Sequence, residues 1–255
     1  MKVTTVIPSR GVASVSRALS IIQILVEHPE HELGVSEIAR RIGIGKSTAH
    51  QLLSTLVAHG FVEQNENSGL YGLGTRLIEA GAVAASHAGL GPAVTPVLEE
   101  LVRETGETTS IGIIVQKEIV LVHRVEAQSV LRVDLKVGTR FPLHSSAIGQ
   151  VILASMPQKA CARIFDELAL ESKERETAEH DVERARVNGY AIVHDTPVAG
   201  INAIAVPIRG VEGKAIAGLV IAGPSFRFDP NNVRDTAIKK ATLIAQKVGQ
   251  IHASW

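Results

Sequence analysis

The amino-acid sequence predicts an α+β protein with two domains: a small N-terminal domain of helices and one hairpin, and a larger C-terminal domain around one antiparallel sheet. Three observations lead to this prediction. The chain of 255 residues is longer than one typical domain. Apolar residues follow helical spacing as far as about residue 60, and strand-like apolar runs alternate with helical segments after about residue 108. Short turn clusters separate several of these runs, which favours hairpins over parallel crossovers.

The composition excludes several classes of protein. Hydrophobic residues make up 45% of the chain, so it can bury a large core and is not globally disordered. Aromatic residues make up 3%, which argues against a stacking surface for single-stranded nucleic acid. The formal net charge is zero, so contact with duplex DNA requires a local cationic patch.

The single cysteine, Cys161, excludes an intramolecular disulfide. Without a signal sequence or a long apolar run, we expect a cytoplasmic protein with no membrane span.

Three helices are predicted in the N-terminal domain. Residues 1–14 lack a periodic apolar face, and we expect them to form a flexible arm. Helical spacing predicts a first helix over Val15–Glu27 and a second over Val35–Gly43, where the glycine suits a tight helix exit. A third helix is predicted from Lys46 to about His59, before Gly60. Its buried stripe is predicted to be Leu52, Leu53, Leu56 and Val57.

A hairpin is predicted directly after the third helix. Phe61–Gln64 and Leu70–Leu73 have strand-like sequences, and Asn65–Gly69 between them is a cluster of turn residues. Two helices joined by a glycine-containing turn are typical of a helix-turn-helix, and a following hairpin is typical of its wing. Residues 15–74 are therefore predicted to form a winged helix-turn-helix domain that binds double-stranded operator DNA.

The candidate DNA-binding residues lie around the start of the third helix. Between Arg40 and His59 there are three fixed cations and no carboxylate. A recognition helix reads base edges with residues near its N-terminus, hydroxyl groups suit phosphate oxygens, and glutamine pairs well with an adenine edge. The predicted DNA contacts are Arg41, Lys46, Ser47, Thr48, His50, Gln51 and, just past the wing, Arg76. The alternative for any one of them is structural: Ser47 or Thr48 caps the helix, and the neighbouring side chains are solvated.

The C-terminal domain is expected to span residues 92–255, after a linker of residues 75–91 that contains the predicted helix Thr75–His87. A helix is predicted from Pro92 or Pro96 up to Gly106. Further elements are then expected in this order: strands at Thr109–Val115, Ile119–Val125 and Val130–Val137, a helix from Ser145 or Ser146 to Ser155, helical sequence over Lys159–Asn188, strands at Tyr190–Val193, Ile201–Ile208 and Ala215–Ala222, and a helix over Asn231–Ala253.

Motifs along nearly the whole chain resemble those of the IclR family of bacterial transcriptional regulators. They include Ser14–Leu19 (SVSRAL), Lys46–Leu53 (KSTAHQLL), Thr105–Thr108 (TGET), Pro142–Gly149 (PLHSSAIG) and Gly223-Pro224, in the family's order and spacing. The resemblance implies a GAF-like C-terminal domain that binds a small organic effector, and assembly into a homodimer or a dimer of dimers. It also implies a repressor more often than an activator. The apolar face of the linker helix, with parts of the first helix, is expected to pair two subunits.

The resemblance also places the effector site. In relatives that bind small keto acids, an Asp, a Cys and two Ser line the pocket, and the matching positions here are apolar: Val193, Ala203, Val220 and Ala222. Val133, Phe141, Ala147 and Ile148 are expected nearby, with the helix-entry turn Ser145–Gly149 offering amides to an anionic oxygen. We therefore predict a carboxylate effector with a hydrophobic or aromatic body. The alternative is that these residues only fill the core.

No catalytic, metal or cofactor site is predicted. Gly45-Lys46-Ser47 resembles the end of a phosphate-binding loop, but Arg40 stands where that loop requires glycine. His123 and His144 fit structural roles better than metal coordination. A second hypothesis remains open: a ligand-binding module or enzyme domain in which the winged helix contacts another protein rather than DNA.

Overall fold

The computed structural model describes residues 11–28, 32–87, 90–129, 132–133, 135–210 and 212–253, and the chain divides into two compact units, residues 1–84 and 85–255. Residues 1–10 of the predicted arm lie outside the described residues. The first helix begins at Ala13, two residues before its predicted start. None of the described helices is long and apolar enough to cross a membrane.

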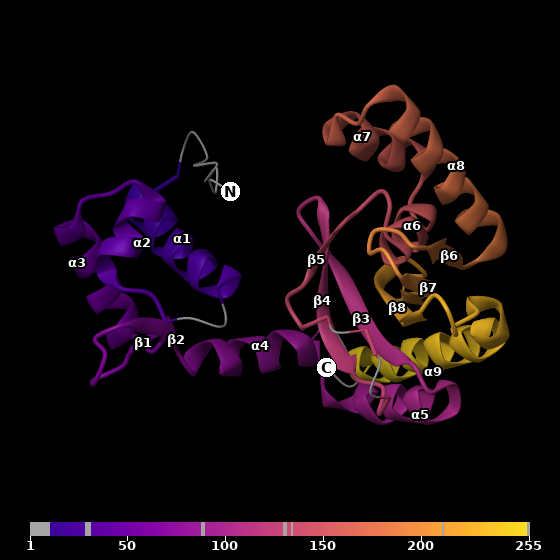
Figure 1. The fold of residues 1–255 in the computed structure, drawn as a ribbon, viewed down its shortest axis with the longest axis horizontal. Coiled ribbons are helices and arrows are strands. Elements are labelled where there is room, and N and C mark those ends of the chain that lie inside the picture. Colours follow the sequence, from indigo (N-terminus) through magenta and orange to yellow (C-terminus); the bar gives the residue numbers. More distant parts are fainter. Residues whose placement is uncertain are drawn as a thin grey trace. The chain divides into compact units, whose positions relative to one another are not determined.

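The N-terminal unit is a helix-turn-helix with a wing, as the sequence predicts. Its helices are α1 (Ala13–Glu27), α2 (Val35–Ile42) and α3 (Lys46–Ala58). An antiparallel hairpin of β1 (Val62–Gln64) and β2 (Tyr71–Leu73) follows them (Figure 1). Gly43 adopts a left-handed conformation with φ of 69°, which ends α2 and starts the turn into α3. These elements share one apolar core that includes Ile21, Ile38, Leu53, Val62 and Tyr71.

The face that α3 buries differs in part from the predicted stripe. Leu53 and Leu56 are buried as expected, but Leu52 is half-buried and Val57 is exposed. Ala49 is fully buried instead. Residues 49, 53 and 56 are four and three positions apart, so they form the row that faces the core, and the two misassigned residues flank it.

The end of the wing lies directly against the end of α3. The amide of Gly74 donates to the carbonyl of Phe61 at 3.0 Å, and the amide of Arg76 donates to the carbonyl of Gly60 at 3.1 Å. A Cβ at Gly74 would lie 2.2 Å from the Gly60 oxygen, so only glycine permits this approach. Helix α4 (Arg76–His87) begins at this junction.

The C-terminal unit is built around one antiparallel sheet, as predicted. Its strand order is β5-β4-β3-β8-β7-β6, and every pairing is antiparallel (Figure 1). The strands are β3 (Thr108–Val115), β4 (Glu118–Val125), β5 (Arg140–Pro142), β6 (Ala191–His194), β7 (Ile201–Arg209) and β8 (Ala215–Pro224).

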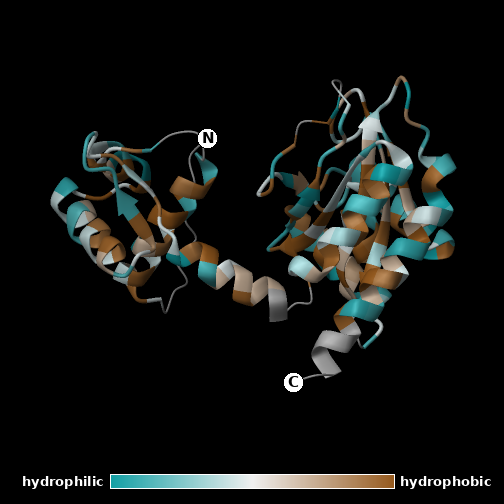
Figure 2. Cartoon of the chain, turned by 90° about the horizontal axis from the view of Figure 1, so that it is seen from below, coloured by the Kyte–Doolittle hydropathy of each residue, from teal (hydrophilic) through white to brown (hydrophobic). Residues whose placement is uncertain are grey.

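Helices cover both faces of this sheet. Helix α5 (Thr95–Thr105), preceded by the short η1 (Pro92–Val94), and helix α9 (Arg234–Ala253), preceded by η2 (Pro230–Val233), share a core with one face. Helix α6 (Ala147–Ala154) packs on the other face, with α7 (Gln158–Leu168) and α8 (Ser172–Asn188) in the same apolar cluster. In Figure 2 hydrophilic and hydrophobic residues alternate along the helices of this unit, as expected for helices that cover a sheet with one face. The predicted helical stretch 159–188 is divided at Ala169, whose φ is 51°.

The strand predicted over Val130–Val137 is wrong for the described residues of that stretch. Residues 132, 133, 135 and 136 are irregular, and the edge of the sheet beside β4 is instead taken by the three-residue β5. The alternating apolar pattern has another cause. Val133 is 3% exposed because it packs into the cluster under α6, and the chain then turns at Gly138, where φ is 90°.

Candidate DNA-binding surface and ligand cavity

The first turn of α3 has no side-chain cap. Gly45 occupies the N-cap position with an extended backbone, and within the described chain neither Ser47 nor Thr48 caps the helix. The first backbone bond of the helix runs from the amide of Ala49 to the carbonyl of Gly45 at 3.0 Å. The amides of residues 46, 47 and 48 precede that bond, so they are directed out of the helix end and can meet an external acceptor such as a phosphate oxygen.

Five predicted DNA-binding residues lie together at this end of α3. Lys46, Ser47, His50 and Gln51 are exposed, and Thr48 is half-buried. Residues 46 and 50, and residues 47 and 51, are one helical turn apart, so their side chains are neighbours on the helix surface, beside the row that contains the buried Ala49 and Leu53. The structure thus brings these side chains onto one solvent-facing surface.

Arg41, a sixth predicted contact, takes part in an ion-pair network on α2. Its Nε lies 2.7 Å from Glu37 Oε1, and Nη2 of Arg40 lies 2.7 Å from the same oxygen. Hydrogen bonds from Arg40 and then Arg41 lower the pKa of Glu37 to about 2, so this carboxylate stays charged across the physiological range. Arg41 also contacts Nε2 of His28 through Nη1.

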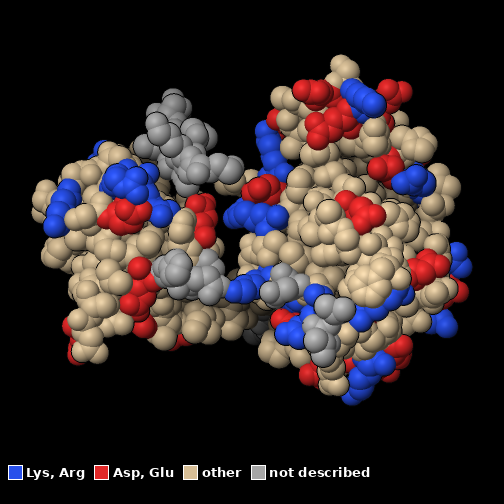
Figure 3. Space-filling view, viewed as in Figure 1, with Lys and Arg blue, Asp and Glu red and all other residues tan. Residues whose placement is uncertain are grey.

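Glu37 lies just before the carboxylate-free stretch from Arg40 to His59, so it was not among the residues predicted for this surface. Its spacing of three and four residues from the two arginines was the available signal. Figure 3 shows acidic and basic side chains side by side over α2. Within the described residues Lys46 makes no ion pair, so it is the least compensated cation of this surface.

Arg76, the seventh predicted contact, lies elsewhere. Its backbone is held by Gly60, past the C-terminal end of α3, and its side chain pairs with Glu79 at 2.7 Å. Lys46 stands at the other end of the helix, about 20 Å away at 1.5 Å per residue. Arg76 therefore does not join the surface at the start of α3.

All eight predicted effector residues line one cavity between the sheet and α6. Its floor includes a row of directly paired residues, Thr108 on β3, Ala222 on β8, Ala203 on β7 and Val193 on β6. Val220, Phe141, Val133, Ala147 and Ile148 complete the predicted set around it. The cavity has a volume of about 60 Å³. That is room for a few water molecules, but less than the about 150 Å³ of a cavity that holds benzene.

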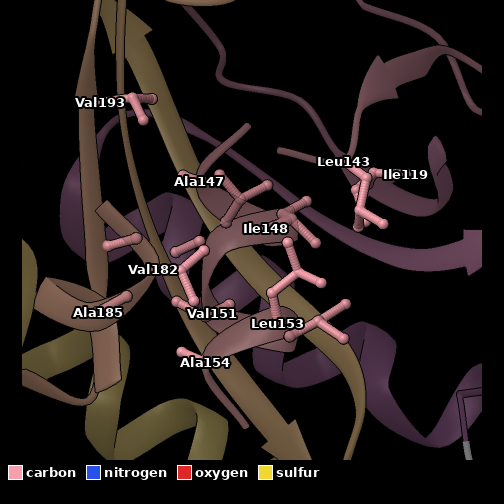
Figure 4. Close-up of a cluster of buried hydrophobic side chains, with 14 of the residues drawn as sticks. Ile119, Leu143, Ala147, Ile148, Val151, Leu153, Ala154, Val182, Ala185 and Val193 are labelled. Carbon is pink, nitrogen blue, oxygen red and sulfur yellow. The ribbon is translucent and has the colours of Figure 1, made fainter. Parts of the chain in front are cut away.

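Two glycines beneath α6 set how closely the helix approaches the floor. Gly112 and Gly218 are paired neighbours on β3 and β8, and Ile148 rests on both of them. A Cβ at Gly149 would lie 1.8 Å from the carbonyl oxygen of Leu143, so the turn before the helix also requires glycine. Ser146 caps α6 by accepting from the amide of Gly149 at 3.2 Å. Figure 4 shows Ala147 and Ile148 on α6 within the surrounding apolar cluster.

The cavity also has a polar end that the sequence reasoning missed. Thr108 and Ser110 on β3, Arg124 on β4 and Ser146 line it. Thr196, in the loop after β6, is a further polar residue of the cavity wall. The Arg124 side chain is only 4% exposed. Its Nη2 donates to the carbonyl of Val133, and its Nε lies 3.7 Å from Glu126 Oε1.

An irregularity in β4 explains why Arg124 was missed. The pairing of β3 with β4 is regular from the turn as far as Gly112, which pairs with Leu121. If it continued regularly, Ser110 would lie opposite His123. A register shift after Ile111 leaves Val122 unpaired and sets Ser110 opposite Arg124. A bulge of this kind reverses which side chains face each side of the sheet. Arg124 therefore faces the cavity, and His123 faces α5, where its Nε2 lies 3.2 Å from Thr95 Oγ1.

No candidate metal site accompanies these features in the part of the chain that the structure describes: no group of three or more His, Cys, Asp or Glu side chains could hold an ion there. His144 instead pairs with Glu174, with Nε2 and Oε1 2.9 Å apart.

Comparison with known proteins covers both units. Residues 14–66 match the model of the IclR helix-turn-helix domain, and residues 82–250 match that of the bacterial transcriptional regulator IclR C-terminal domain. The HTH-type transcriptional regulator XynR of Escherichia coli is 31% identical over 226 residues, which cover 86% of this chain and 88% of the relative. The regulator KdgR of the same organism is 32% identical over 231 residues, which cover 88% of this chain and 87% of the relative.

Solved structures agree with these matches. The IclR transcriptional regulator of Alicyclobacillus acidocaldarius superposes with a TM-score of 0.81 at 26% identity, over 94% of this chain and 98% of that one. An IclR homologue of Microbacterium hydrocarbonoxydans, crystallised with 4-hydroxybenzoate, shares the fold with a TM-score of 0.82 at 22% identity. The match covers 92% of this chain and 99% of that one. The chain therefore belongs to the IclR family of transcriptional regulators, with a helix-turn-helix DNA-binding domain at its N-terminus.

Proposed function

We propose that this regulator binds operator DNA through α3 and that a small organic acid in the C-terminal cavity controls its affinity for that DNA. The observation that carries the proposal is the surface at the start of α3. Its uncapped first turn, the uncompensated Lys46 and the exposed His50 and Gln51 share one face. Basic groups and amides there suit phosphates, and the two longer polar side chains suit base edges in the major groove.

The remaining predicted contacts have supporting roles in this proposal. Ser47 and Thr48 offer hydroxyl groups and amides to phosphate oxygens beside Lys46. Arg41 and Arg76 contact the DNA backbone at the edges of the interface, and each exchanges part of an internal ion pair for a phosphate.

The cavity favours an effector with a carboxylate and an apolar body. Ala203, Val220, Ala222 and Val193 form an apolar floor, and the relative crystallised with 4-hydroxybenzoate shares this fold. An aromatic acid needs more space than about 60 Å³. Binding must therefore widen the cavity, and the loop segment Thr196–Val198 is the irregular wall that can move.

The active form in this proposal is a homodimer or a dimer of dimers, because a dimer presents two recognition helices to a two-fold operator. Val15, Leu19 and Val26 form an exposed apolar stripe on α1, and Ile78 is 72% exposed on α4. Apolar faces of this kind are expected at a subunit contact. The effector shifts operator affinity through the linker helix by a coupling free energy of about 1–3 kcal/mol. Repression is the expected response, and the Escherichia coli relative AllR, 28% identical, is named a repressor.

A mobility-shift assay with DNA from upstream of the chain's own gene tests the proposal. Lys46→Ala removes one phosphate contact, so it should lower affinity for all sequences and reduce the salt slope by about 1. Gln51→Ala should instead relax preference at one base pair, by about 1–3 kcal/mol. Lys239→Ala, an exposed cation on α9, is the matched control and should bind as the wild type does.

Retention of full DNA affinity and specificity by both α3 variants would contradict the DNA-binding role of this surface. It would favour the second hypothesis, in which the winged helix contacts another protein. The same assay, repeated with a panel of carboxylic acids, tests control by an effector: at least one acid should shift the binding curve.

A further inference from the structure

Three polar residues of the cavity lie on β3 and β4, and the floor beside them on β8, β7 and β6 is apolar. Thr108 and Ser110 on β3 and Arg124 on β4 form the polar end. The apolar end lies across β8, β7 and β6, where Ala222, Ala203 and Val193 continue the row that begins at Thr108. Neighbouring strands are about 4.8 Å apart, so the floor passes from polar to apolar within one strand spacing. A ligand that matches this floor has one polar end and one apolar end.

Arg124 is the charged group at the polar end. Its side chain is 4% exposed, and it lines the same cavity as Ser110, its direct partner across the β3–β4 pairing. Burial of a guanidinium in mostly apolar surroundings is costly unless anionic or polar groups surround it. The Nε of Arg124 lies 3.7 Å from Oε1 of Glu126, and Glu126 also pairs with Arg132 at 3.0 Å.

The first residues of α6 line the same cavity. Ala147 and Ile148 line it, and Ile148 lies over Gly112, which is two residues from Ser110 on the same face of β3. Only the Gly149 amide of this first turn is used by the Ser146 cap. A positive helix end and a buried cation thus both favour an anion at this place.

We propose that Arg124 and Ser110 bind the carboxylate of the effector, so that its apolar body lies over β8, β7 and β6. The inference rests on the proposed function, because it concerns the same cavity. It adds the residues that select an acid over a neutral analogue of the same shape. The bulge at Val122 is then a functional feature, because it turns Arg124 toward the ligand.

The purely structural alternative is that Arg124 only holds the segment at Val133 through the hydrogen bond to its carbonyl. The two roles differ in what they predict. A structural arginine affects acid and amide ligands equally, whereas a carboxylate-binding arginine affects only the acid. The ratio of the two affinities therefore separates them.

The experiment uses calorimetric titration of the full-length protein with benzoate, 4-hydroxybenzoate and phenylacetate, and with the corresponding neutral amides. The wild type should bind at least one acid more tightly than its amide. Arg124→Gln should weaken binding of that acid by about tenfold to a hundredfold, the range for a hydrogen bond to a charged group, and leave the amide unaffected. The acid affinity of Arg124→Lys should lie between that of the wild type and that of Arg124→Gln. Arg140→Gln removes an exposed cation from β5 outside the cavity and should change neither affinity.

Ser110→Ala keeps the proposal testable if Arg124→Gln does not fold. It should weaken acid binding severalfold with a thermal unfolding midpoint close to that of the wild type. Equal acid affinity in the wild type and in folded Arg124→Gln and Ser110→Ala overturns the inference and leaves the proposed function intact. If the wild type binds none of the acids, the effector part of the proposed function fails, and the inference fails with it. DNA binding, measured separately, is decided by the α3 variants.

Discussion

Ile148, in the first turn of α6, packs directly on Gly218 of β8, where an added Cβ would lie 2.7 Å from Ile148 Cγ2 and 3.5 Å from its Cα. Gly112 on the neighbouring strand is equally crowded, at 2.8 Å from Ile148 Cδ1. The two paired glycines therefore let the start of α6 approach the sheet more closely than any side chain would permit. Because Ala147 and Ile148 line the cavity, this contact also sets its height.

Gly218→Ala should lift the start of α6 from the sheet. Overpacking of a well-filled core costs about 1–3 kcal/mol of unfolding free energy. The amides of the first turn should also move away from the polar end of the cavity, so acid affinity should fall. Urea unfolding and calorimetric titration of the full chain measure the two effects.

The double variant Gly218→Ala, Ile148→Ala is the internal control for this prediction, because it removes the Cγ2 atom that the new methyl group would meet. Gly218→Ala should therefore lower the unfolding free energy less when it is added to Ile148→Ala than when it is added to the wild type. Wild-type stability and acid affinity in Gly218→Ala would show that α6 is not held in place by this contact.

Glu37→Gln should strengthen DNA binding. Glu37 engages Arg40 and Arg41 and carries a full negative charge, since its pKa is about 2. Removal of that charge frees both guanidinium groups for phosphates. Each added phosphate contact steepens the dependence of log K on log salt by about 0.9, so the slope should steepen by up to about 1.8.

Fluorescence anisotropy with a labelled operator at several salt concentrations measures this slope. Glu212→Gln is the matched control, because Glu212 also pairs with a cation, Lys214, but lies in the C-terminal unit. It should leave the slope unchanged. If Glu37→Gln weakens operator binding, the network serves instead to orient Arg41 toward the DNA.

Local patterns in the sequence predicted most elements of this fold. Helix α2 ends at Gly43 and helix α5 at Gly106, both left-handed as expected for glycine after a helix. The hairpin over 108–125 followed from its turn residues. The resemblance to the IclR family, rather than a local pattern, predicted Ala203 and Val220 at the effector site, and both line the cavity.

Two features were not predictable because they depend on pairing between distant segments. The apolar alternation at 130–137 looks like a strand, but β5 takes the place beside β4 and Val133 packs into the core without pairing. Arg124 was missed because the bulge at Val122 is invisible to simple alternation, which places His123 on the cavity side. Strand register beyond a bulge is fixed by packing rather than by the turn.

The bulge also makes His123 a contributor to pH-dependent stability. Burial lowers the pKa of His123 below its usual value, since it is half-buried against α5 with its Nε2 near the Thr95 hydroxyl. The unfolded chain has the ordinary histidine pKa of about 6.5, so it binds the proton more readily than the folded chain does. Stability from this residue is therefore complete above about pH 6.5 and is lost as the pH falls through the lower folded value.

Urea unfolding at pH 7.5 and at pH 5.5 should give a smaller unfolding free energy at the lower pH. In His123→Gln the polar contact to Thr95 remains possible but the titrating group is gone. The difference in unfolding free energy between pH 7.5 and pH 5.5 should therefore shrink. An undiminished difference in this variant would assign the acid sensitivity to other groups. It would also mean that His123 is as well solvated in the folded chain as in the unfolded one, and so that the bulge does not direct it into the interface with α5.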